Sequence, residues 1–233
     1  MKINNEKEIF DMFIGDCELR KQLQTPFIEK TDGRVWATNG RILIMVNPEC
    51  ISEEYKPLDM GGHLPVRDFN TDILILVSDI EKAFRKLPQE PEVTITYEKH
   101  ECPECGGEGT VEAEYYADYD NEDYTISGTC PICDGSGELE EEIRTPTGKT
   151  IPVDGSVIKI GEGYFRWDLV KKIAETCKKL DITDMHVRRN SLRDMSIIEL
   201  NRDIHIAIMP MYLEDEEGKK IKKDAVKVKG VKA

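Results

Sequence analysis

The sequence predicts an α+β fold in which helices alternate with short, mainly antiparallel strands. In three segments, apolar residues recur at helical spacing. Each of these is followed by strand-like segments, and turn residues lie between the strands. A four-cysteine segment interrupts this pattern once. Because the strands are joined by hairpin turns rather than by helical crossovers, we expect antiparallel pairing.

The expected helices each have one apolar face and cover residues 6–19, 79–87 and 167–180. At the start of the second helix, Ser78 and Glu81 have the spacing of a capping box, and Pro88 ends it. The expected strands cover residues 27–29, 34–38, 41–46, 73–77, 93–97, 157–160, 185–188, 196–200 and 204–208. Together these elements form repeated helix-plus-antiparallel-strand units, about three in the chain.

The longer interval between the second and third helices is explained if the cysteine segment is an insertion. This divides the chain into four parts: residues 1–99, an inserted module at 100–142, residues 143–217, and a basic flexible tail at 218–233. The formal net charge is −14, and residues 100–142 contain fourteen Asp or Glu and no Lys or Arg. The tail holds seven lysines and one Asp. The total charge therefore says little about binding by the individual parts.

The chain is long enough to bury a core, since 39% of its 233 residues are apolar. Its longest apolar runs are far shorter than the ~20 residues that a membrane span needs, and no basic-then-apolar leader begins it. We expect a cytoplasmic protein with no membrane partner.

Two CxxC pairs supply four thiolates, which is the number that a closed tetrahedral zinc site requires. They are Cys102 with Cys105 and Cys130 with Cys133. The pattern predicts one structural zinc, because four sulfur ligands leave no position for a water nucleophile. A free-thiol cluster or a redox pair is the alternative.

Each cysteine pair belongs to a CxxCxGxG repeat, and this repeat resembles the cysteine-rich module of DnaJ-type co-chaperones. The resemblance implies the same four zinc ligands. That family has four repeats, whereas this sequence has two and no J-domain signature. Between the pairs, residues 112–124 interleave acids with four tyrosines. This segment is either a solvated extension or a protein-binding tip.

Residues 34–43 read Arg-Val-Trp-Ala-Thr-Asn-Gly-Arg-Ile-Leu, which resembles a hairpin of bacterial DNA sliding clamps, the beta subunit of replicative DNA polymerase. Asn39 stands where that family has Asp, and the residue usually found between the Gly and the Arg is missing. Residues 206–213 read Ile-Ala-Ile-Met-Pro-Met-Tyr-Leu and are similar to that family's terminal strand, with Tyr212 in place of Arg.

The clamp resemblance implies helices that hold the DNA backbone without reading its sequence. The matching basic residues are Lys82, Arg85, Lys86, Arg166, Lys171, Lys172, Lys178 and Lys179. The alternative is an ordinary solvated helix face. The resemblance also implies an apolar cleft for partner peptides, with Met209, Pro210, Met211 and Leu213 at the matching positions. Members of that family have six units per chain. A chain with only three units could therefore encircle DNA only as a homo-oligomer.

No arrangement of Ser, His, Asp or Cys favours an enzyme. The sequence therefore favours a non-enzymatic, DNA-associated accessory protein that acts in replication. A zinc-dependent protein-interaction adaptor or co-chaperone-like binder, without DNA binding, is the main alternative. A weaker one is an inhibitor whose acidic surface imitates DNA.

Overall fold

A computed structural model describes residues 2–15, 18–60, 69, 71–117, 122–189, 195–211 and 225–232. The chain forms two compact units, which we call the sheet unit and the ribbon unit. The sheet unit comprises Met1–Pro88 and Pro152–Ala233, and the ribbon unit comprises Gln89–Ile151. The ribbon unit is larger than the insertion predicted at residues 100–142, because its two long strands, Gln89–Glu101 and Glu138–Pro152, extend beyond both ends of that segment.

The main sheet of the sheet unit has the strand order β16-β5-β12-β13-β14-β3-β2-β1-β4. Its strands are β1 (Phe27–Glu29), β2 (Val35–Thr38), β3 (Ile42–Val46), β4 (Pro57–Leu58), β5 (Thr71–Leu76), β12 (Asp184–Arg189), β13 (Ser196–Glu199), β14 (Ile204–Ile208) and β16 (Val231–Lys232). Every pairing in it except that of β1 with β4 is antiparallel, which confirms the expected pairing. The triplets β1–β3 and β12–β14 meet where β3 pairs with β14.

The helices of the sheet unit are α1 (Glu6–Asp11), α2 (Val77–Phe84) and α3 (Trp167–Lys179), with short 3-10 turns η1 (Glu18–Leu23) and η2 (Pro48–Cys50). The first helix ends earlier than predicted. After it the chain bends, so that Phe13 enters the core and the Gly15 amide donates to the Leu23 carbonyl. The predicted capping box is wrong, because β5 runs directly into α2 and Ser78 already lies inside the helix.

A second, three-stranded sheet has the order β11-β10-β15. Its strands are β10 (Val157–Ile160), β11 (Gly163–Arg166) and β15 (Val226–Val228). The prediction of a flexible tail is therefore wrong for the described residues 225–232, where β15 pairs with β10 and β16 pairs with β5. Valines alternate with lysines here, so the strand buries Val228 and leaves Lys227 exposed. Residues 212–224 of this region lie outside the described residues.

The larger core of the sheet unit includes side chains from all three helices and from one face of the main sheet. Ile44 of β3 and Ile206 of β14 lie opposite each other in it, and both are 0% exposed. Strand alternation directs Trp36, Met45 and Ala207 into a smaller cluster on the other face of the sheet. The main sheet is therefore apolar on both faces around the β3–β14 pair.

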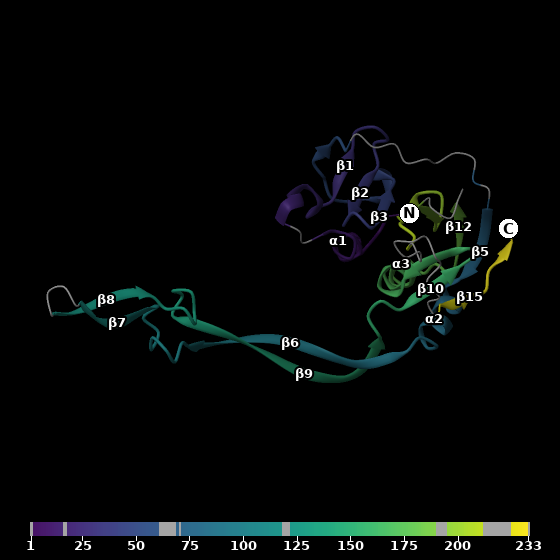
Figure 1. The fold of residues 1–233 in the computed structure, drawn as a ribbon. Helices are drawn as coiled ribbons and strands as arrows, with labels where there is room; N and C mark the ends of the chain where they lie inside the picture. The colour runs from purple at the N-terminus through teal and green to yellow at the C-terminus, as the bar shows by residue number, and fades with distance from the viewer. Residues whose placement is uncertain are drawn as a thin grey trace, which may run out of the picture. The chain divides into compact units, whose positions relative to one another are not determined.

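The ribbon unit consists of two strand pairs. β6 (Gln89–Glu101) pairs with β9 (Glu138–Pro152), and β7 (Thr110–Ala117) pairs antiparallel with β8 (Glu122–Thr129). Figure 1 shows β6 and β9 side by side as a long two-stranded ribbon, which the cysteine segments join to the β7–β8 hairpin. Among the described residues of this unit, the buried side chains cluster only around the cysteines. Nowhere in the described part of the chain is a helix both long and apolar enough to cross a membrane.

Replacing Ile206 with Ala removes a side chain buried at the β3–β14 pair. We expect the free energy of unfolding to fall by about 2–5 kcal/mol, because the substitution loses apolar burial and leaves a cavity. Denaturant unfolding followed by tryptophan fluorescence measures this, since Trp36 and Trp167 both lie in the sheet unit. Leu76→Ala is the control: Leu76 is 48% exposed, so its loss should cost much less. Equal costs for the two variants would contradict this account of the core.

Candidate functional site

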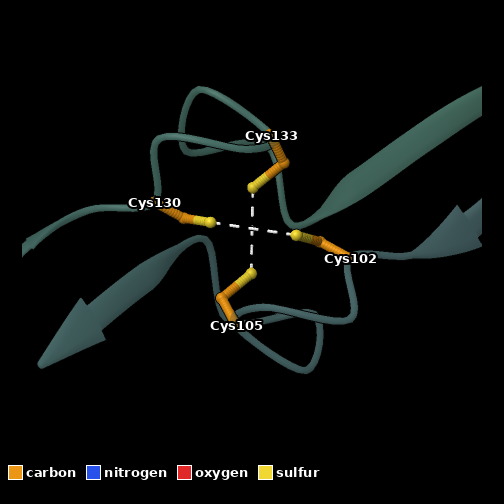
Figure 2. A group of neighbouring side chains, drawn as sticks. All are labelled: Cys102, Cys105, Cys130 and Cys133. Carbon is orange, nitrogen blue, oxygen red and sulfur yellow. Dashed lines mark hydrogen bonds between the residues drawn. The ribbon is translucent and has the colours of Figure 1, made fainter.

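The four cysteines of the ribbon unit come together in one cluster. The sulfur atoms of Cys102, Cys105, Cys130 and Cys133 all lie within 4.8 Å of one another, and Figure 2 shows them pointing toward a common centre. Cys102 and Cys130 are 0% exposed. The sequence prediction that these four residues form one group is confirmed, and the group can hold a metal ion.

The spacing of the sulfurs matches a tetrahedral site. The Sγ atoms of Cys102 and Cys130 are 3.8 Å apart, and those of Cys105 and Cys133 are 3.7 Å apart. A metal with bonds of about 2.3 Å to four tetrahedral sulfurs places those sulfurs about 3.8 Å apart. All four cysteines are free thiols, so the cluster is not a pair of disulfides. The residues present therefore fit a closed four-sulfur centre.

Each CxxCxGxG repeat is held by the other. The Cys102 amide donates to the Gly137 carbonyl, and the Cys130 amide donates to the Gly109 carbonyl, both at 2.9 Å. Within each repeat, the amide of the last glycine donates to the second sulfur, from Gly109 to Cys105 at 3.2 Å and from Gly137 to Cys133 at 3.3 Å. The repeats are therefore two equivalent halves of one site, and amide donors favour the thiolate form of two sulfurs.

The thiols of Cys130 and Cys133 have different pKa values because their surroundings differ. Burial raises the pKa of Cys130 to about 11. Burial also acts to raise the pKa of Cys133, but hydrogen bonds from the Gly137 amide and from neighbouring groups outweigh it and lower that pKa to about 7. Cys133 is thus the more readily ionised of the two, and a bound cation would favour ionisation of both.

Glycine is required where the repeats touch. Gly109 and Gly137 have φ values of +76° and +75°. A Cβ atom on Gly109 would collide with the Gly135 carbonyl oxygen, and one on Gly137 would collide with the Gly107 carbonyl oxygen. Each repeat places this glycine four residues after its second cysteine, and glycine adopts a positive φ without strain.

A second candidate site lies in the sheet unit, at the end of the β3–β14 pair. It is a pocket of about 150 Å³ lined by Thr38, Gly40, Arg41, Ile42, Leu43, Met195, Ala207 and Met209. The Met209 amide donates to the Arg41 carbonyl at 3.0 Å, which extends the β3–β14 pairing into the pocket wall. The lining is mostly apolar, and Arg41 is an exposed cation in the wall.

The turn between β2 and β3 forms one wall of this pocket and is held by its own side chains. The Asn39 side chain accepts hydrogen bonds from the amides of Arg41 and Ile42 at 3.0 and 3.2 Å. The Thr38 hydroxyl donates to the Ile42 carbonyl and accepts from the Gly40 amide. Gly40 has a φ of +84°, which explains why this turn needs glycine.

The residues predicted for partner binding do not all line the same pocket in the structure. Met209 lines the pocket and is 44% exposed. Pro210 is buried, and the Met211 amide donates to the Tyr164 carbonyl at 2.7 Å. Leu213 lies outside the described residues. Sequence reasoning missed Leu43 and Ala207, although outward positions on β3 and β14 follow from strand alternation, and no sequence signal pointed to Met195.

Most of the basic residues predicted to contact DNA are in ion pairs within the sheet unit. The pairs are Lys82 with Asp79, Arg166 with Asp154 and Asp168, Lys171 with Glu175, Lys178 with Glu81, and Lys179 with Glu8. No ion pair within the described residues involves Arg85, Lys86 or Lys172. Arg85 and Lys86 are exposed at the end of α2, and burial lowers the pKa of Lys172.

No family model matches the chain, and no curated protein sequence is similar to it. Solved structures that are similar include the DNA polymerase sliding clamp of Pseudomonas aeruginosa (TM-score 0.43, 13% identity, 91% of this chain and 65% of that one). DNA polymerase III subunit beta of Borrelia burgdorferi is also similar (TM-score 0.42, 10% identity, 91% of this chain and 63% of that one). So is the sliding clamp of Bacillus subtilis (TM-score 0.40, 14% identity, 88% of this chain and 61% of that one). The chain thus spans less than two thirds of the length of these clamps.

We expect Gly137→Ala to weaken metal binding by at least about tenfold, because the new Cβ forces the two repeats apart. Cobalt(II) titration, followed by thiolate-to-cobalt absorption, measures the affinity and should give one ion per wild-type chain. Gly128→Ala is the control, since Gly128 has open space around its Cβ position and an ordinary φ. If both variants bind cobalt as the wild type does, the close packing of the repeats is not what forms the site.

Proposed function

We propose that this chain is a non-enzymatic, DNA-associated accessory protein whose clamp-like sheet unit docks a partner protein. The observation that carries the proposal is the pocket at the end of the β3–β14 pair. Thr38, Gly40 and Arg41, from the clamp-like hairpin, and Met209, from the clamp-like strand end, line it together. These motifs are more than 160 residues apart in the sequence, and each was matched to the same family separately.

The chemistry of the pocket suits an apolar side chain of a short peptide. Leu43, Met195 and Met209 offer flexible apolar contact, and thioether side chains adapt to varied partners. The exposed guanidinium of Arg41 can pair with an acidic group of the same peptide. A single pocket of this kind supports weak, exchangeable docking rather than a permanent complex.

For the ribbon unit we propose one structural zinc, held by Cys102, Cys105, Cys130 and Cys133. Zinc is the metal that four thiolates in tetrahedral geometry ordinarily take, and its role here would be to replace a hydrophobic core. The DnaJ-like repeat supports the same ligands. No ligand position is left for catalysis by the metal.

The DNA part of the proposal rests on the clamp-like motifs and on α2. Arg85 and Lys86 are exposed and outside the ion pairs that occupy most other candidate cations. Because only some of the predicted helix cations lie outside the ion pairs of the described residues, we expect weak, salt-sensitive binding to the phosphate backbone without sequence preference. Encirclement of DNA by this chain would require a homo-oligomer.

One observation favours the adaptor as a second candidate. The whole net charge of −14 belongs to the ribbon unit, which has 17 acidic and 3 basic residues, whereas the sheet unit has 29 of each. A neutral sheet unit attracts DNA only through local patches. In the adaptor reading, the zinc-bearing module binds proteins and DNA plays no part.

Met209→Glu should weaken peptide docking, because it places a charge in the wall of the apolar pocket. The probe is a panel of overlapping peptides that tile a bacterial replicative DNA polymerase, and binding is measured by fluorescence polarisation. At least one peptide should bind the wild type and bind the variant at least about tenfold more weakly. Ile132→Glu, at an exposed site in the ribbon unit, is the control. Absence of binding by every peptide, or equal binding by both variants, would contradict docking at the pocket.

The double variant Arg85→Glu/Lys86→Glu should lose most retention of duplex DNA at about 50 mM salt, because both substitutions reverse an exposed charge. Gel-shift titration measures the retention, with Arg144→Glu/Lys149→Glu in the ribbon unit as the charge-matched control. Retention by the double variant equal to that of the wild type would contradict DNA contact through Arg85 and Lys86. Absence of DNA binding by the wild type would favour the adaptor.

A further inference from the structure

An apolar stripe is exposed on the long ribbon. Val93, Ile95 and Tyr97 of β6 are 41%, 45% and 62% exposed, although large apolar side chains elsewhere in the described residues are mostly buried. They alternate along one strand, so they share one face of the β6–β9 pair. The two-stranded ribbon has no further layer packed on this face within its own unit. We call these three residues the stripe.

The surroundings of the stripe are acidic. On the same face, Lys99 pairs with Glu138 and Glu140 of β9, at 3.0 and 3.9 Å. Arg144 of β9 pairs with Glu142. The two cations flanking the stripe are therefore already neutralised, and further carboxylates remain on this unit.

The other face of β6 carries more carboxylates at alternate positions. Glu92 and Glu98 flank Thr94 and Thr96 there, and Glu98 is exposed. A strand placed beside β6 would thus meet apolar side chains on one face and, on the other, two threonines with a carboxylate at each end.

The outer edge of β6 is available for such a strand. β6 and β9 form a sheet of only two strands, so in the described part of the chain the outer edge of each has no strand partner. Edge strands of this kind accept an extended peptide through main-chain hydrogen bonds, while the alternating side chains supply specificity.

Charge decides which occupant fits. The ribbon unit carries −14, and four thiolates around a divalent metal add further negative charge. This field repels nucleic acid and anionic lipid, and it also opposes pairing between the ribbons of two copies. It attracts a cationic segment. The stripe in addition favours a segment in which every second residue is apolar.

We propose that the β6 edge of the ribbon docks an extended segment of a partner protein in which apolar and basic residues alternate. The segment adds to β6 as a strand, places its apolar side chains beside Val93, Ile95 and Tyr97, and directs its basic side chains toward Glu92 and Glu98. This site belongs to the ribbon unit and is independent of the pocket in the sheet unit, so either can fail without the other.

The test uses the full chain loaded with zinc and a fluorescein-labelled octapeptide of alternating Lys and Val. Val93→Thr/Ile95→Thr/Tyr97→Thr removes the apolar stripe but keeps strand propensity, because Thr also favours strands. We expect the triple variant to bind at least about tenfold more weakly. Ile126→Thr/Ile132→Thr removes exposed apolar side chains elsewhere in the ribbon unit, and we expect it to bind as the wild type does. Cobalt absorption and circular dichroism check that each variant is folded.

Two further peptides distinguish strand addition at β6 from binding by electrostatic attraction alone. An octapeptide of four Lys followed by four Val has the same composition without alternation, and it should bind at least about tenfold more weakly than the alternating peptide. An alternating Glu-Val peptide should not bind. The proposal is overturned if the triple variant retains wild-type affinity, or if the block peptide binds as tightly as the alternating one.

Discussion

The pairing of β3 with β14 is the interaction on which the sheet unit depends. It joins two hairpin-linked triplets that are far apart in the sequence, and it aligns Ile44 with Ile206 at the centre of the core. The same register continues from Met209 to Arg41, so the strand pair ends where the pocket begins. The pocket therefore exists only when the two parts of the sheet unit are assembled. An intact pocket would therefore report on the folded state of the whole unit.

The ribbon unit follows a different rule. Its described residues build no apolar core apart from the cysteine cluster, so metal binding and folding are expected to be one process there. Reciprocal hydrogen bonds between the two repeats make the site symmetric. Four sulfur ligands would leave no coordination position open on a bound metal. A bound metal would join the β6–β9 ribbon rigidly to the β7–β8 hairpin. Its charge would be too small to offset the acids of the unit, so the loaded protein would keep its acidic character.

The elements that could be predicted from the sequence are those whose signals lie in neighbouring residues. Turn residues and alternation located most strands, and the cysteine spacing located the four-cysteine cluster that Figure 2 shows. Sequence reasoning failed where tertiary contacts decide: α1 ends before Phe13 so that this side chain can enter the core, and β15 forms because β10 offers it an edge. The pocket could be predicted only in part. Met209 and the hairpin were found from motifs, but Met195 enters the wall from a segment with no signal of its own.

If a partner peptide docks in the pocket at the end of the β3–β14 pair, its binding must perturb the side chains that line the pocket. The most direct measurement is methionine methyl NMR of the labelled full chain, titrated with the polymerase-derived peptide that binds it most tightly. The account predicts that the methyl resonances of Met195 and Met209 shift with peptide, because both line the pocket, while that of the buried core residue Met185 stays in place. Peptide binding that leaves Met195 and Met209 unperturbed would contradict the claim and locate the docking surface elsewhere.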